Sequence, residues 1–344
     1  MASQKTATFT TADLVQDFEA TNSEVEMTDD HVRQTSGNEG FISTPMASLY
    51  QITGLRSLHS TQAPVMTNKA NVPVQRPRDL ISRGLLDWSD ADRLVQLYLR
   101  KSDYYLYGIA SKYQNTESIR NASSLLLVSI CTVSALQDPS SQPLYRTCHA
   151  ELRKLVFNFV FTPQVDLEDF RGLCIACFWL SDLSWSLSGL AIRRAVEFEL
   201  QKSTNLLVDI CNHSESFISG MSTDRTRAIE RVRLWYLFYI CDQHLSILYA
   251  RPSTIHEYDS VSECEQYLAA VQNTNTDMRI VSQVALLRIL SNVTKLFGQN
   301  LDARIPTIFI SQIDEFNRQL DQWATTWLNK CGGSPNRCSF INGS

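Results

Sequence analysis

The chain has 344 residues, of which 44% are hydrophobic and 19% are charged, and its formal net charge at pH 7 is −5. This length allows one large domain or two modest ones with a real core. The negative charge excludes a protein that attracts nucleic acid through an overall basic field, so any such contact needs a local basic module.

Residues 1–76 are polar, rich in Thr, Ser, Asn and Gln, and contain few large apolar side chains. Such a segment cannot bury enough surface to offset its ordering entropy, so we predict a disordered, acidic N-terminal region. The stretch ADLVQDFEATNSEVEMTDDH alternates acidic and hydrophobic residues, as disordered activation segments do. A solvated tail without that role is the favoured interpretation, and an activation segment is the alternative. Pro73 and Pro77 mark the entry into the ordered part.

The pattern after Arg78 is helical, because apolar residues recur at the spacing of one helix face. LISRGLL is a short turn or helix that stops at Gly84, and Ser89 is the expected N-cap of the next helix. The helices that follow are, in chain order, TESIRNASSLLLVSICTVSALQD, QPLYRTCHAELRKLVFNFVF, DLEDFRGLCIACFWL with Asp166 as its cap, and SLSGLAIRRAVEFELQKS.

A long helix comes next, STDRTRAIERVRLWYLFYICDQHLSILYAR, which Pro252 ends. Three more lie around SECEQYLAAV, DMRIVSQVALLRILSNVTKLFG and ISQIDEFNRQLDQWATTWLNK, and RIPTIFI is the one short strand candidate. We therefore predict an all-α fold, an irregular array of packed helix pairs behind a disordered N-terminal tail. The helical domain is expected at 77–330, and 331–344 is expected to be a frayed tail.

The nine cysteines begin only at Cys131 and lie within apolar runs. This usage is typical of reduced thiols in a cytosolic or nuclear protein, not of a secreted disulfide framework. Cys174 and Cys177 form a Cys-x-x-Cys pair, but a structural zinc site needs a second pair, or histidines, on converging loops. We therefore predict core cysteines and no metal site.

No pattern for catalysis stands out. The sequence contains no Gly-rich phosphate loop and no GxSxG elbow, and His256 and Glu257 lack the HExxH spacing. The apolar runs are well short of a membrane span of roughly 18 residues. We predict no catalytic residue, no cofactor, no enzyme activity and no membrane partner.

Two features of the long helix suggest binding. Its start carries Arg225, Arg227, Arg231 and Arg233, which could meet phosphate, but a solvated first turn with acidic partners is favoured, so no DNA-binding residue is predicted. Its centre is dense in aromatic residues around Trp235, which could line a ligand pocket. These aromatics occupy all faces of one helix, so core packing is the favoured interpretation. A small-molecule-binding or enzymatic all-α domain is the alternative function.

The stretch RVRLWYLFYICDQHLSILYARPSTI, residues 231–255, resembles the signature helix of the fungal-specific transcription factor domain. That domain is the regulatory middle region of fungal zinc binuclear cluster regulators. SWSLSGLAIRRAVEFELQKS resembles the second recognisable segment of the family, and the resemblance covers roughly residues 78 to 330. The signature residues that we single out are Arg231, Arg233, Trp235, Asp242, Arg251, Pro252 and Gly189.

The sequence also departs from the family. Family members usually begin with a basic six-cysteine cluster that binds two zinc ions and reads DNA, whereas no cysteine precedes Cys131 here. Zinc is therefore expected only if a missing N-terminal cluster exists. Ala250 stands where glycine usually precedes the Arg-Pro step. A truncated gene model, a splice product and a cluster-less paralogue would each fit.

The resemblance implies a nuclear regulator of a metabolic pathway, such as secondary metabolism or nutrient use. Its expected partners are other transcription regulators or a DNA-binding partner, a second copy in a homo- or heterodimer, and a metabolite ligand. From the residues, Asp242 is an acid within an apolar helix, so we predict that it pairs with an arginine of the domain.

Overall fold

The computed structural model describes residues 79–163, 165–212, 221–255, 261, 264–271, 274–298 and 306–330. All of them belong to one compact unit, Val74–Ser344. The N-terminal region predicted to be disordered, the predicted frayed tail and the loop at His256 lie outside the described residues.

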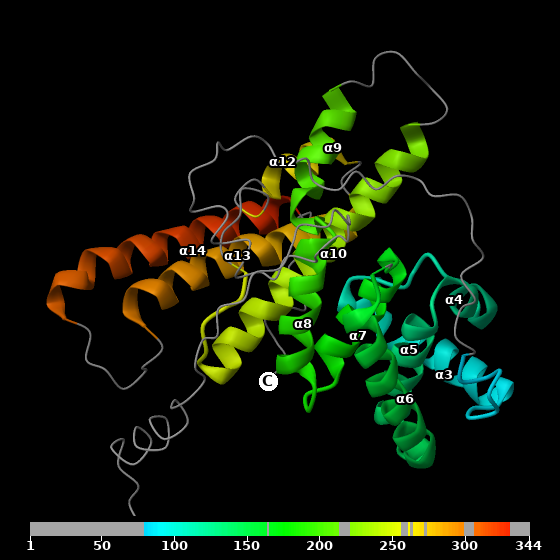
Figure 1. Cartoon of the computed structure of the whole chain (residues 1–344). Helices are drawn as coiled ribbons and strands as arrows, with labels where there is room; N and C mark the ends of the chain where they lie inside the picture. The colour runs from blue at the N-terminus through cyan, green and yellow to red at the C-terminus, as the bar shows by residue number, and fades with distance from the viewer. Residues whose placement is uncertain are drawn as a thin grey trace, which may run out of the picture. The chain divides into compact units, whose positions relative to one another are not determined.

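The described part of the chain is helical and contains no strand, which confirms the all-α prediction (Figure 1). Its α-helices are α3 (Trp88–Lys101), α4 (Thr116–Ala122), α5 (Ser124–Gln137), α6 (Gln142–Phe161), α7 (Leu167–Trp179), α8 (Ser184–Glu197), α9 (Ser203–Asn212), α10 (Met221–Tyr249), α12 (Cys264–Ala270), α13 (Asn275–Phe297) and α14 (Ile310–Lys330).

Helix α5 is the centre of the N-terminal half. It is apolar on every side and packs against α3, α4, α6 and α7 (Figure 1). Helix α7 approaches α5 so closely that a Cβ on Gly172 would lie 2.8 Å from the Cα atom of Leu126. Glycine is therefore required at this crossing.

Helix α10 is the centre of the C-terminal half, where it packs against α7, α8, α9 and α13. Trp235, Tyr236, Phe238 and Tyr239 are all fully buried. The favoured interpretation of this aromatic run as core packing is confirmed, because it faces neighbouring helices on every side.

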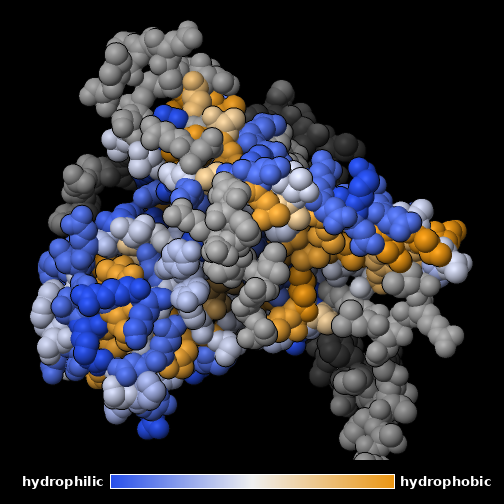
Figure 2. All heavy atoms as spheres, turned by 180° about the vertical axis from the view of Figure 1, so that it is seen from behind, coloured by the Kyte–Doolittle hydropathy of each residue, from blue (hydrophilic) through white to orange (hydrophobic). Residues whose placement is uncertain are grey.

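Helices α13 and α14 lie side by side as a hairpin (Figure 1). Within the described residues, α13 is the one helix long and apolar enough to cross a membrane by length and composition alone. Its contacts with α10, α12 and α14 are those of a helix inside a folded domain. Hydrophobic residues reach the surface on this hairpin, on the right in Figure 2, and Ile308 and Ile310 are among the exposed side chains there.

Three local predictions are wrong. The helix predicted from Thr116 through Asp138 divides at Ser123, whose hydroxyl accepts the backbone N–H groups of Leu125 and Leu126 and so caps α5. Helix α3 begins one residue after Asp87, so Ser89 is not its cap. In the strand candidate, Thr307–Phe309 forms a 3₁₀ turn that leads into α14. Asp166, by contrast, caps α7 as predicted, with Asp169 completing a capping box.

Candidate functional site

A pocket of about 220 Å³ lies where four elements meet. Its walls come from the loop at 107–112, from Arg171 of α7, from one face of α10 and from the first turns of α13. The α10 residues in the wall are Glu230, Arg233, Leu234 and Leu237, which follow the spacing of a single helix face. The pocket thus lies along the first half of the signature helix.

The loop on the opposite wall has an unusual backbone. Tyr107 and Gly108 both adopt the left-handed conformation, with φ of 57° and 67°. The turn is held by Asp103, whose carboxylate accepts the backbone N–H of Ala110 at 2.8 Å. This reversal of the chain turns the carbonyl of Ile109 toward Arg171, which donates a hydrogen bond to it.

Asp103 itself gives the loop a pH dependence. The carboxyl is buried, and burial raises its pKa from 3.8 to about 6 despite the Ala110 hydrogen bond and the nearby Arg171 charge. Because the folded state holds this proton more tightly than the unfolded chain, stability contributed by Asp103 is lost as the pH rises from about 4 to about 6.

Asp103→Asn is therefore expected to be more stable than the wild type at pH 7, because the amide oxygen still accepts the Ala110 N–H and carries no charge. The gain in free energy of unfolding should be about 1–3 kcal/mol at pH 7 and should vanish near pH 4. Urea unfolding of both proteins from pH 4 to pH 7 measures it. Asp209→Asn at an exposed position of α9 is the control. A difference that stays constant with pH would contradict the assignment.

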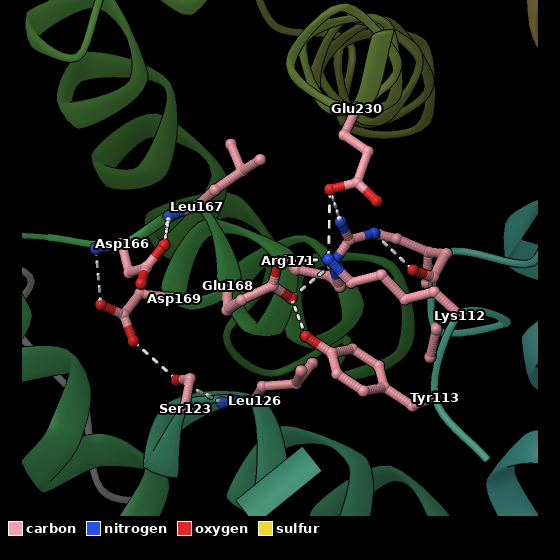
Figure 3. A network of polar contacts seen from close by, with 12 residues as sticks. Lys112, Tyr113, Ser123, Leu126, Asp166, Leu167, Glu168, Asp169, Arg171 and Glu230 are labelled. Atoms are coloured by element: carbon pink, nitrogen blue, oxygen red, sulfur yellow. Dashed lines mark hydrogen bonds and ion pairs between the residues drawn. The ribbon is translucent and has the colours of Figure 1, made fainter. Parts of the chain in front are cut away.

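Charged side chains form a network in the pocket wall and directly behind it (Figure 3). Glu168 accepts from Lys112 Nζ at 2.6 Å and from Arg171 Nε at 2.8 Å, and the Tyr113 hydroxyl donates to it as well. Glu230 reaches the same two cations from α10, with 3.1 Å from its Oε2 to Lys112 Nζ and 3.4 Å to an Arg171 nitrogen. The network therefore joins the loop, α7 and α10.

The network keeps Glu168 ionised although it is buried. Burial alone raises the pKa of this carboxyl, but the Arg171 charge and the hydrogen bonds from Lys112 and Tyr113 hold the pKa below its usual value. Burial and the hydrogen bond to Glu168 raise the pKa of Tyr113, so its hydroxyl remains a donor.

A second ionic cluster joins α10 to α13 at the other end of the pocket. Arg233 Nε and Nη2 each lie 2.7 Å from an oxygen of Asp277. Tyr267 donates to the same carboxylate at 2.6 Å, and the Thr274 hydroxyl donates at 2.5 Å. Burial raises the pKa of Asp277, but Arg233, Thr274 and Tyr267 together hold the pKa below its usual value.

The signature residues do not all meet at one site. Among them, Arg233 lines the pocket. Arg231 donates to the Phe198 carbonyl at 2.8 Å and to the Ser203 hydroxyl at 3.1 Å, which links α10 to the start of α9. Trp235 is fully buried. A Cβ on Gly189 would meet no atom within 4 Å, so packing does not explain glycine at that position.

Asp242 and Arg251 stabilise the turn after α10. The Asp242 carboxylate is buried and accepts the backbone N–H groups of Thr254 and Ile255, both at 2.8 Å. Arg251 stacks on the Trp185 ring, 4.9 Å from its centroid, just before Pro252. The pairing of Asp242 with an arginine stays a prediction, and the backbone contacts show an acceptor role that the sequence did not suggest.

Asp242→Ala is expected to lower the free energy of unfolding by about 1–3 kcal/mol, because two backbone donors lose their acceptor. Asp242→Asn should lose less, since its amide oxygen can still accept both. Urea denaturation followed by far-UV circular dichroism distinguishes the two variants. Equal losses in both would show that the carboxylate charge, and not these hydrogen bonds, matters.

Sequence reasoning missed the other charged residues of the site: Lys112, Glu168, Arg171, Glu230 and Asp277. Glu168 and Arg171 carried a usable signal, because two opposite charges three positions apart stand at the start of a helix that is apolar from Leu173 onward. Asp277 carries no comparable signal, because an acid in the first turn of a helix is common. Its role depends on contacts with α10 and α12.

The cysteines that the structure describes are free thiols, and most are buried. Cys174 and Cys177 lie in the core of α7, where burial raises the pKa of both thiols. Among the described side chains, no group of three or more His, Cys, Asp or Glu could hold a metal ion. The prediction of core cysteines is confirmed.

The family of the chain follows from its similarity to known proteins. The family model described as the middle domain of prtT, the transcriptional activator of proteases, matches residues 84–341. The chain belongs to this family. The match spans every helix of the C-terminal half and the whole pocket, and it confirms the resemblance to the fungal transcription factor middle region.

One curated relative is the transcriptional activator of proteases prtT of Emericella nidulans, which is 34% identical over 293 residues. The alignment covers 83% of this chain and 41% of the relative, so the chain spans about two fifths of that protein's length. No solved structure matches the chain.

Proposed function

We propose that this PRTT-like middle domain belongs to a nuclear transcription activator that controls protease genes. The observation that carries the proposal is the relative named as a transcriptional activator of proteases, aligned over 83% of this chain. The domain contributes regulation and not catalysis. The charged side chains of the site support this role, because they are paired with one another and hold helices together.

The proposal assigns different roles to different segments of the chain. Residues 77–330 act as the regulatory domain, and the acidic residues 1–76 act as an activation segment. Contact with promoters comes from a zinc cluster encoded outside this sequence or from a partner regulator, in a homo- or heterodimer.

Deletion of the gene in its fungal host tests the function. Transcripts of protease genes and protease activity in the medium are expected to fall and to return when the gene is restored. Unchanged protease transcripts and activity in the deletion strain would overturn the assignment to proteases. A genome-wide transcript comparison of the same strains would then show which genes depend on the regulator.

Two further measurements test the roles assigned to these segments. Residues 1–76 fused to an unrelated DNA-binding domain should activate a reporter gene, and a silent reporter would remove the activating role of that segment. The purified 344-residue chain should hold no stoichiometric zinc and bind duplex DNA without sequence selectivity. Tight, selective binding would place DNA recognition within this chain.

A further inference from the structure

We propose that the pocket between the 107–112 loop, α10 and the start of α13 binds a free aliphatic α-amino acid. The inference goes beyond the proposed function and does not rest on it, because it follows from the size, charge balance and apolar floor of the pocket. Its test is a direct binding measurement.

The size of the pocket limits the ligand. Its volume of about 220 Å³ lies below the range of about 300–1,000 Å³ that is usual for sites of drug-sized ligands. Part of the wall is aliphatic, since Leu234, Leu237 and Ile280 line it from the side of the core. A ligand of amino-acid size with a short hydrocarbon side chain fits these walls.

The charges of the pocket favour a ligand that carries both signs. Lys112, Arg171 and Arg233 line it, and each of these cations is already paired with at least one carboxylate. The paired carboxylates are Glu168, Glu230 and Asp277, of which Glu230 lines the pocket, so three nearby negative charges balance the three cations. A bare anion or cation would disturb this balance in a partly buried site, whereas a zwitterion preserves it.

The carboxylate end of the ligand has a defined place near Arg233. Arg233 uses Nε and Nη2 for Asp277, and its side chain lines the pocket. Thr276, in the first turn of α13, lies in the same wall. The guanidinium and the positive end of the α13 dipole together attract a carboxylate.

The ammonium end of the ligand is assigned to Glu230. Its Oε2 atom receives Lys112 and Arg171, and no described residue donates to its Oε1. Glu230 and Arg233 are three positions apart on one face of α10, so both ends of an amino acid meet neighbouring side chains. The aliphatic side chain then lies against Leu234 and Leu237.

Isothermal titration calorimetry of the purified full chain with each of the twenty standard L-amino acids tests the proposal. An aliphatic amino acid, with L-leucine as the reference probe, is expected to bind. The matched compounds 4-methylpentanoate and 3-methylbutylamine each lack one charged group and should bind about tenfold more weakly or worse. No binding by any amino acid, or equal binding of either matched compound, would overturn the proposal.

Two pairs of variants locate the ligand. Thr276→Phe places a bulky ring in the pocket wall and should abolish binding, while Asn275→Phe, at an exposed neighbouring position outside the pocket wall, should bind as the wild type does. Glu230→Gln should weaken L-leucine about tenfold and leave 4-methylpentanoate unchanged. Glu315→Gln on exposed α14 is its control. Circular dichroism verifies folding, and undiminished binding by folded Thr276→Phe would place the ligand elsewhere.

Discussion

Replacing Gly172 with alanine is expected to lower the free energy of unfolding by about 3 kcal/mol, at the upper end of the usual cost of overpacking. The new Cβ would lie 2.8 Å from Leu126 Cα and 2.9 Å from Leu126 N. Both atoms belong to the backbone of α5, so no side chain can rotate away. Helices α5 and α7 must separate, and the packing around α5 is lost with them.

Gly189→Ala is the matched control, because it makes the same chemical change on the neighbouring helix α8. No atom lies within 4 Å of a Cβ at Gly189. Alanine is the better helix former by about 1 kcal/mol, so this variant should be as stable as the wild type or more stable. Urea unfolding followed by far-UV circular dichroism measures both. Similar stability of the two variants would show that α5 and α7 can separate without cost.

Replacing Arg171 with methionine is expected to lower the free energy of unfolding by about 3–5 kcal/mol, because it leaves buried carboxylates without their central cation. The Arg171 side chain is only 7% exposed and that of Glu168 only 11%. The change also removes the donor to the Ile109 carbonyl, so the loop beside the pocket loses its anchor on α7.

Arg318→Met on α14 provides the comparison. Arg318 pairs with Glu315 at the same three-residue spacing as Arg171 with Glu168, but its side chain is 67% exposed. The expected loss there is below about 1 kcal/mol. Adding Glu168→Gln to Arg171→Met should recover part of the stability, because it removes the unpaired charge. Equal losses at the two arginines would show that burial does not set the value of these ion pairs.

The helices could be predicted from the sequence because their information is local. The apolar spacing, Asp166 before α7 and Pro252 after α10 each act within a few residues. The sequence did not predict the break between α4 and α5 at Ser123, because the apolar pattern continues through it. A single hydroxyl that caps two backbone N–H groups does not alter the spacing of apolar residues along the sequence.

The site could be predicted only in part. Residues 231–255 were singled out by resemblance, but the partners of Arg233 and Glu230 were not. Glu230 meets Lys112, which lies 118 positions earlier in the chain. The requirement for glycine at position 172 likewise follows only from its contact with α5. Contacts of this kind arise from the packing of helices and leave no periodic signal.

The anchoring of α13 at the base of the α13–α14 hairpin determines where the hairpin extends. The buried residues of α13 lie between Asp277 and Ser291, so its far end extends beyond the packed part. A helix of 23 residues is about 34 Å long at 1.5 Å per residue. The packed stretch from Asp277 to Ser291 fixes the direction of α13, so the end beyond Ser291 extends along that direction. The tip of the hairpin is therefore carried away from the pocket by a helix that is anchored beside it.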